Sequence, residues 1–151
     1  GQAVPATGFA FATLTQGTMR DFKVLLQVGE PERDINEQRT RYAAVFGRYQ
    51  SAGSFHDGEG YVASYNDKNK VVTLWKKLSG QALIEIKSVK LTLNPKASLI
   101  LHGYGDSIQV QSGPYVIIDY LDPNPLLERG KVGLYGTPDL PINQFRAVSF
   151  D

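Results

Sequence analysis

The chain has 151 residues, of which 42% are hydrophobic, and its 16 basic residues nearly balance 15 acidic ones. This length is enough for one hydrophobic core and short for two, so the sequence predicts a single domain over residues 1–151. The near balance of charge leaves no broad basic field for nucleic acid. The absence of cysteine excludes disulfides, thiolate metal sites and a cysteine nucleophile.

The ends of the chain carry no membrane or signal segment that the sequence can identify. No apolar run approaches the ~20 residues that a membrane-spanning helix needs. The first residues, GQAVPATG, contain neither an initiator Met nor a charged signal-peptide region. This start favours a domain that was processed or excised from a larger protein.

Apolar groups of strand length alternate with turn residues through the first half of the chain. The charged segment Gly29–Arg41 has no useful apolar face and predicts a surface loop. Strands are expected at 9–11, 21–28, 42–49, 61–65, 71–76 and 81–87.

The second half predicts a meander of short strands. Gly105-Asp106 and Ser112-Gly113-Pro114 are typical of tight turns, and Asp122-Pro123-Asn124-Pro125 predicts a longer loop. Residues 89–93 either extend the expected strand 81–87 or open a new one, and further strands are expected at 99–101, 108–110, 115–118, 132–134 and 144–150. The whole chain thus predicts about ten to twelve strands and essentially no helix, which is typical of two antiparallel sheets packed face to face.

Within this meander the sequence resembles a known superfamily. GDSIQV from Gly105 follows the pattern Gly-x-x-Ile-x-Val, and GKVGLY from Gly130 follows a strand that ends in Asp and a loop. This order is similar to the C-terminal half of the concanavalin A-like jelly rolls, which include legume lectins, laminin-G-like modules and many glucanases. The resemblance runs from Tyr42 onward, is poor up to Asn36, and implies an all-β, two-sheet antiparallel β-sandwich.

The glucanase branch of this superfamily needs two carboxylates close together on one sheet face. Its strand signature, Glu-x-Asp-x-x-Glu, is missing. Most acidic residues lie in expected turns or loops. Glu85 lies inside the expected strand 81–87 and Asp119 ends the strand that begins at Tyr115, and for both a solvated or turn-binding role is the simpler interpretation. His56 and His102 are the only histidines, and neither lies beside a nucleophile-elbow motif. A glycoside hydrolase that uses Glu85 or Asp119 remains an alternative.

Trp75 is the only tryptophan of the chain. In the expected strand 71–76 it shares a side with Val71 and Thr73, while Val72 and Leu74 take the other side. If Val72 and Leu74 face the core, Trp75 faces a groove or solvent.

A saccharide site needs flat aromatic rings for the C–H faces of sugars and planar or charged groups for their hydroxyls. Trp75, Tyr61 and Tyr65 lie on adjacent expected hairpins, and Arg48 ends the strand that leads to the loop of His56. We therefore predict that a poly- or oligosaccharide binds to these five residues, with the rings stacking and Arg48 and His56 donating hydrogen bonds. The alternative is that the rings are ordinary packing within a sheet.

The resemblance has further implications for metal, location and partner. Calcium is common in the superfamily, and HDGEG supplies Asp57 and Glu59 as oxygen ligands, although the spacing is not that of a recognised calcium loop. A lectin-like module of a secreted or cell-surface, bacterial protein, with other domains of that protein as further partners, is the first hypothesis. A laminin-G-like domain that binds protein is the third, beside the hydrolase.

Overall fold

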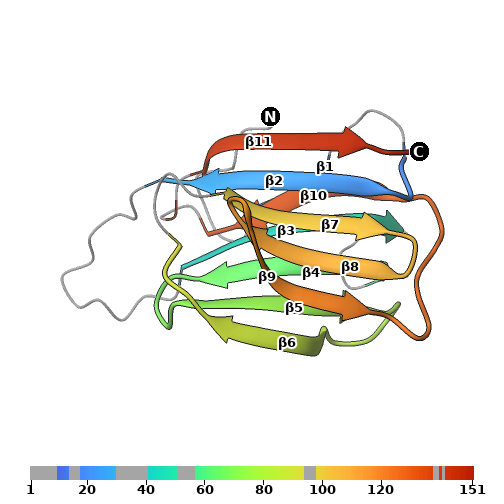
Figure 1. Ribbon diagram of the computed structural model, residues 1–151, viewed down its shortest axis with the longest axis horizontal. Helices are drawn as coiled ribbons and strands as arrows, with labels where there is room; N and C mark the ends of the chain where they lie inside the picture. Colours follow the sequence, from blue (N-terminus) through green and yellow to red (C-terminus); the bar gives the residue numbers. More distant parts are fainter. Residues whose placement is uncertain are drawn as a thin grey trace.

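The structure is a computed structural model that describes residues 18–29, 41–50, 57–93, 98–137, 140 and 142–151, and the backbone alone at 10–13. These residues contain eleven strands and no helix, and accordingly no helix that could cross a membrane. The strands, shown in Figure 1, are β1 Ala10–Thr13, β2 Phe22–Val28, β3 Tyr42–Gln50, β4 Glu59–Asn66, β5 Val71–Lys77, β6 Ile84–Lys90, β7 Ser98–Tyr104, β8 Ser107–Ser112, β9 Tyr115–Leu121, β10 Lys131–Gly136 and β11 Ile142–Ser149.

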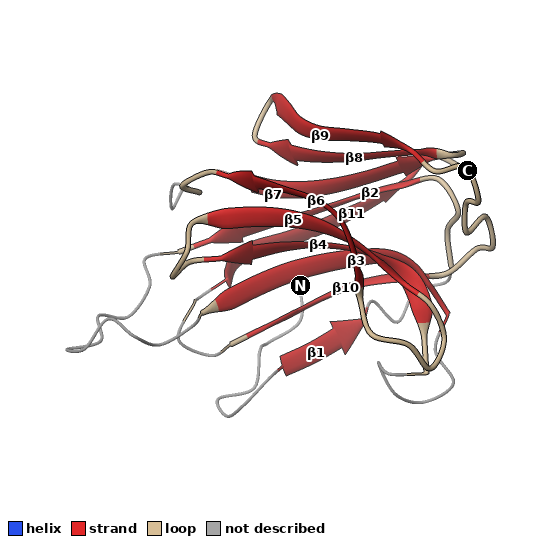
Figure 2. Cartoon of the chain, turned by 90° about the horizontal axis from the view of Figure 1, so that it is seen from below, coloured by secondary structure: helices blue, strands red, loops and turns tan. Residues whose placement is uncertain are grey.

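The strands form two sheets whose neighbours are all antiparallel. One sheet has six strands in the order β1-β10-β3-β4-β5-β6, and the other has five in the order β11-β2-β7-β8-β9. In Figure 1 the strands β7, β8 and β9 lie over β3, β4 and β5, and Figure 2 shows the two layers from the side. The predicted all-β, two-sheet antiparallel β-sandwich is confirmed.

The main core lies between the two sheets and follows from the two-residue period of each strand. On β2 the burial alternates strictly, with Phe22, Val24, Leu26 and Val28 turned inward. The partners across the sandwich come from every second residue of the central strands of both sheets. They include Tyr61, Ala63, Tyr65, Val72, Leu74, Leu99, Leu101, Ile108 and Val110, each at most 1% exposed.

The turns between β7, β8 and β9 form as their residues predict. Tyr104 pairs with Ser107 and leaves Gly105 and Asp106 as a two-residue turn, in which Gly105 has a φ of 58°. Gly113 has a φ of 57° in the next turn, and positive φ favours glycine because it has no Cβ. These glycines fix the register of the meander.

The expected strand Gln81–Lys87 differs from the observed one. Strand β6 begins at Ile84 and continues to Lys90, because Ile84 pairs with Lys76 and Lys90 pairs with Val71 at the two ends of β5. The expected loop at 29–41 lies outside the described residues, apart from Gly29 and Arg41. Length of pairing with the neighbouring strand, and not local alternation alone, sets the bounds of β6.

The Phe22 ring is packed between the two sheets where two glycines make room for it. A Cβ on Gly47 of β3 would overlap the ring, and a Cβ on Gly103 of β7 would lie 2.6 Å from it. Phe22 is itself 0% exposed, so the ring has no open space to move into. The sandwich therefore depends on the absence of a side chain at these two positions.

Gly47→Ala should lower the free energy of unfolding by about 1–3 kcal/mol, because an added methyl group overpacks a full core. Urea unfolding followed by circular dichroism measures the change. A variant within about 0.5 kcal/mol of the parent, the range of neutral surface changes, would show that the ring is free to shift.

Candidate functional site

A second, smaller hydrophobic cluster lies on the outer face of the six-stranded sheet. Its members alternate with the inward-facing residues of the same strands, so they lie on the side away from the other sheet. The cluster consists of buried Ala44, Phe46, Tyr49, Val62 and Tyr135, with Trp75 and Leu83 packed against it. We call these seven residues the outer cluster. Among the described residues no second sheet packs on this face, and the partly exposed members of the outer cluster, Trp75 and Leu83, are its candidate binding residues.

A pocket of about 300 Å³ opens beside the outer cluster. Tyr42, Ser64, Trp75, Leu83 and Tyr135 line it, and none of these side chains is charged. The indole Nε1 of Trp75 donates a hydrogen bond to Ser64 Oγ at 2.8 Å, which fixes the ring against β4. The pocket therefore combines a held, partly exposed indole with hydroxyl groups at its wall.

Hydroxyl groups continue from this pocket across β5 to β6. Ser64 pairs with Thr73 and Thr73 pairs with Ser88, so the three lie in one row across three strands. Thr73 Oγ1 and Ser88 Oγ are 2.8 Å apart, and Ser88 Oγ donates to Glu85 Oε1 at 2.9 Å. We call Ser64, Thr73, Ser88 and Glu85 the polar row. It runs alongside the aromatic side chains of the outer cluster.

Trp75 lies where the alternation of its strand places it. Val72 and Leu74 are 0% exposed and belong to the core between the sheets, and Trp75 packs on the opposite face. The structure thus confirms that Val72 and Leu74 face the core and that Trp75 lies on the other face of the sheet. That Trp75 contacts a saccharide stays a prediction.

Tyr61 and Tyr65 need a correction, because both side chains point into the core. Tyr61 is 0% exposed and its hydroxyl donates to Asp122 Oδ2 at 2.6 Å. Tyr65 is 1% exposed and its hydroxyl accepts from Leu93 N at 3.2 Å. Burial raises the pKa of both phenols. A ring with no exposed face cannot stack on a sugar, so neither tyrosine is a binding platform.

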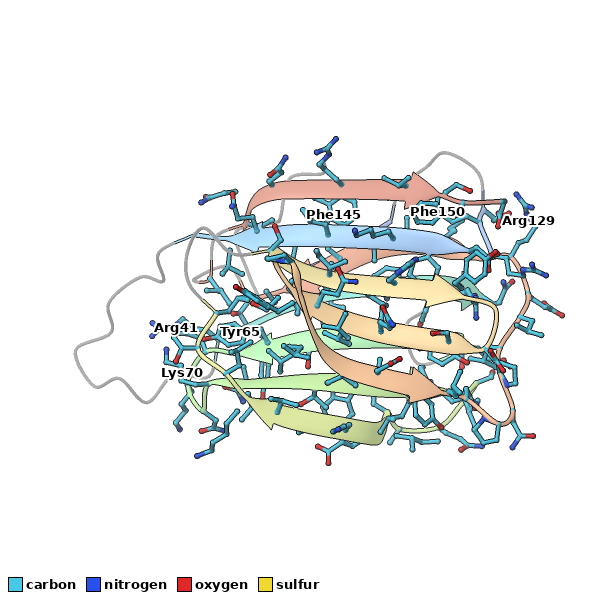
Figure 3. The ribbon with its side chains drawn as sticks, viewed as in Figure 1. Arg41, Tyr65, Lys70, Arg129, Phe145 and Phe150 are labelled. Carbon is cyan, nitrogen blue, oxygen red and sulfur yellow. The ribbon has the colours of Figure 1, made fainter. Side chains whose placement is uncertain are left out.

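Figure 3 places Tyr65 at one end of the sandwich, near Arg41 and Lys70. Both cations are ion-paired to the buried carboxylate of Asp67, Arg41 Nε at 3.3 Å and Lys70 Nζ at 2.9 Å. The charged groups at this end of β4 therefore form a structural network of ion pairs.

Arg48 also needs a correction, because its guanidinium is completely buried. Nε donates to Arg20 O at 2.6 Å, Nη1 to Leu126 O at 3.1 Å, and Nη2 to Asp21 Oδ1 at 3.3 Å. Its backbone has a φ of 49° at a register shift between Gly47 and Gln50, which turns the side chain inward. Arg48 ties three segments of the chain together, and its side chain has no exposed surface with which to contact a ligand.

The loop of His56 gives no support for calcium. His56 lies outside the described residues, and those residues contain no group of three or more His, Asp or Glu side chains that could hold a metal. Asp57 O accepts from Ser79 Oγ, and Gly58 O accepts from the ammonium of Lys77. Calcium at Asp57 and Glu59 therefore stays a prediction, because residues 51–56 of this loop lie outside the described residues. We derive no role for the ion.

The two carboxylates considered for catalysis do not come together. Glu85 is on β6 of the six-stranded sheet, where it bonds to Ser88. Asp119 is on β9 of the five-stranded sheet, where it lies 3.4 Å from Gln109 Nε2. A glycosidase pair needs both carboxyl groups on one site, so these two residues do not form one.

Four residues of the pocket were missed by the sequence analysis: Tyr42, Ser64, Leu83 and Tyr135. Tyr135 pairs with Ala44, and Ser64 also pairs with Ala44, from opposite sides of β3. Ser64 and Tyr135 are 71 positions apart in the sequence, and only strand pairing on the two sides of β3 brings them to one pocket. The alternation of β10 shows that Tyr135 shares a side with Gly133, but the order of strands in the sheet is not readable from the sequence.

Comparison with solved structures supports the fold class. The chain is similar to a carbohydrate binding module, CBM66, from Bacillus subtilis, with a TM-score of 0.72 and 18% identity over 96% of this chain and 84% of that one. It is also similar to sheep galectin-11 in complex with glycerol, with a TM-score of 0.62 and 13% identity over 97% and 100% of the two chains. A galectin from Caenorhabditis elegans, LEC-6, gives a TM-score of 0.62 and 10% identity over 91% and 90%. No protein-family model and no curated protein sequence matches the chain.

Arg48→Met should lower the free energy of unfolding by about 3 kcal/mol, because it leaves the carboxylate of Asp21 without its buried partner. Urea unfolding measures this loss. Arg20→Met is the matched control, since Arg20 pairs with the same carboxylate at 3.5 Å while its side chain is 50% exposed. Arg20→Met should lower the free energy of unfolding by less than about 1 kcal/mol. Equal losses in the two variants would contradict the structural role of Arg48.

The stability of the protein should depend on the ionisation of Asp21. Burial raises the pKa of this carboxyl, but the amide of Gly105 and the charges of Arg20 and Arg48 outweigh it and lower the pKa overall. Because its pKa is lowered in the folded state, the carboxyl group of Asp21 stabilises the folded protein at pH values above the ordinary carboxyl pKa. This contribution disappears as the pH falls through the folded-state pKa.

The stability difference between the parent and Asp21→Asn should therefore shrink between about pH 5 and pH 2. Thermal unfolding at a series of pH values measures it, with Asp119→Asn as an exposed control. A difference that stays constant over this range would show that Asp21 is not held in its charged form.

Proposed function

We propose that the chain is a non-catalytic, lectin-like carbohydrate-binding module that holds a poly- or oligosaccharide on the outer face of the six-stranded sheet. The observation that carries this proposal is the fixed, partly exposed indole of Trp75 at the wall of an uncharged pocket. An indole presents the largest flat apolar surface of any side chain, and the C–H face of a sugar ring fits such a surface.

The remaining pocket residues suit a sugar ring of moderate size. Leu83 and the rings of Tyr42 and Tyr135 supply apolar contact around the indole, while Ser64 supplies a hydroxyl at the wall. Ligand sites of this kind combine a mostly apolar lining with a few placed polar groups. The pocket is thus suited to holding a ligand, and its five described lining residues include no acid, base or nucleophile pair.

The similar structures support the same function without identifying a ligand. The bacterial neighbour is named a carbohydrate binding module, and the other two are galectins. Since fold alone does not establish function, the argument rests on the pocket of this chain. A secreted or cell-surface location in a bacterium accompanies this proposal, because polysaccharides are met outside the cell.

Trp75→Ala should weaken saccharide binding by at least about tenfold, equivalent to ~1.4 kcal/mol, because the variant removes the stacking surface. Affinity electrophoresis against a panel of soluble glucans, galactans, mannans, xylans and fructans measures binding. Tyr115→Ala is the matched control, since Tyr115 is an aromatic residue 73% exposed on β9 of the other sheet.

The control should migrate like the parent protein. Circular dichroism of Trp75→Ala checks that the fold is intact, and Trp75→Phe, which keeps a smaller ring, should retain part of the binding. Retention that is unchanged in Trp75→Ala, or retention of the parent by no polysaccharide of the panel, would sink the proposal.

A further inference from the structure

A bulge between β5 and β6 determines which side chain lies beside Trp75. Leu74 pairs with Lys87, so regular pairing would place Ile86 opposite Trp75. The register shifts by one residue at this point, and Glu85 pairs with Trp75 instead. Bulges of this kind re-aim side chains and are common next to functional sites. The shift exchanges an apolar neighbour of the indole for a carboxylate.

Hydrogen bonds hold this carboxylate on the same face as the indole. Ser88 has one hydroxyl hydrogen, which it donates to Glu85 Oε1, so Thr73 is the donor in the 2.8 Å contact between Thr73 and Ser88. The chain of donors therefore runs from Thr73 through Ser88 to Glu85. Thr73 is two residues from Trp75 on one strand, which places the whole chain on the outer face.

Resting on the proposed saccharide-binding function, we propose that Glu85 is the specificity-determining residue of the site and selects neutral saccharide units over anionic ones. A carboxylate accepts hydrogen bonds but donates none, so it suits the hydroxyl groups of a neutral sugar. The carboxylate or sulfate of an acidic sugar has no hydrogen to donate to Glu85, and its negative charge is repelled by the negative charge of Glu85. The specificity would thus come from repulsion of acidic groups by Glu85 as much as from its hydrogen bonds with neutral sugar hydroxyls.

The neighbouring cations do not cancel this charge. Lys87 pairs with Leu74, whose side chain faces the core, and therefore lies on the other side of the strand from the indole. Lys90 lies five residues along β6 from Glu85, about 16 Å of strand. That separation exceeds the Debye length of roughly 8 Å at physiological ionic strength. Lys77 shares the face of Trp75, but it is 2% exposed and its ammonium donates to Gly58 O and Leu78 O. Among the described charges of β5 and β6, Glu85 is thus the exposed one that pairs directly with Trp75.

The test compares a neutral polysaccharide with a charged derivative of the same backbone. A neutral polysaccharide that retains the protein in affinity electrophoresis is compared with its own carboxymethyl derivative, with polygalacturonate and alginate as further acidic probes. The parent should bind the neutral form at least about tenfold more tightly, equivalent to ~1.4 kcal/mol. Raising the salt concentration should narrow this ratio, because salt screens exposed charges.

Glu85→Gln keeps the size and an acceptor oxygen of the side chain but removes its charge. This variant should lose most of the discrimination, and Glu85→Lys should favour the carboxymethyl form. Asp119→Asn, which removes an exposed carboxylate from the other sheet, should bind like the parent.

The outcomes separate the two proposals. Acidic and neutral forms bound equally by the parent through Trp75, or discrimination unchanged in Glu85→Gln, would overturn the role of Glu85 and leave the saccharide-binding function standing. Binding that does not depend on Trp75, or no binding to any probe, would overturn the function and this inference with it.

Discussion

The alternation of side chains along β4 and β5 is the constraint from which the candidate site follows. Because successive residues of a strand face opposite sides, the inward positions 61, 63, 65, 72 and 74 are committed to the core between the sheets. The outward positions, which include Ser64 and Trp75, then share the other face. Strand pairing across β10, β3, β4 and β5 gathers these outward residues into one cluster. The fold thus assigns the single indole to the face of the six-stranded sheet that points away from the five-stranded sheet.

Buried polar groups hold the frame that carries this surface. Arg48 and Tyr61 both bond to the main chain at Leu126, and Tyr61 also bonds to Asp122, which is ion-paired with Lys76 at 2.7 Å. These contacts fasten the long loop after β9 to β3, β4 and β5. A hydrogen-bonded network without an unsatisfied buried side chain in the described residues costs little and specifies a unique arrangement. Arg48 and Tyr61, which the sequence analysis assigned to sugar binding, thus anchor the loop after β9 instead.

Local patterns in the sequence were sufficient for the fold but only partly for the site. Turn residues such as Gly105 and Gly113 and the alternation in VVTLWK predicted the meander and the side on which Trp75 lies. Tyr61 and Tyr65 were assigned to the wrong face because alternation relates residues of one strand and does not say which face meets the second sheet. Arg48 and Glu85 owe their directions to register shifts, and a bulge leaves no mark in a single sequence. The pairing that joins Tyr135 to Ser64 through Ala44 is likewise a long-range property.

The chain contains one tryptophan, so its fluorescence reports on Trp75 alone. Titration of the protein with a polysaccharide that retains it is the most direct test of the account. A sugar ring stacked on the indole removes water from it, and we predict a saturable change in emission whose midpoint equals the dissociation constant measured by calorimetry. Binding that is visible by calorimetry and leaves the emission of Trp75 unchanged at saturation would place the ligand elsewhere and contradict the account.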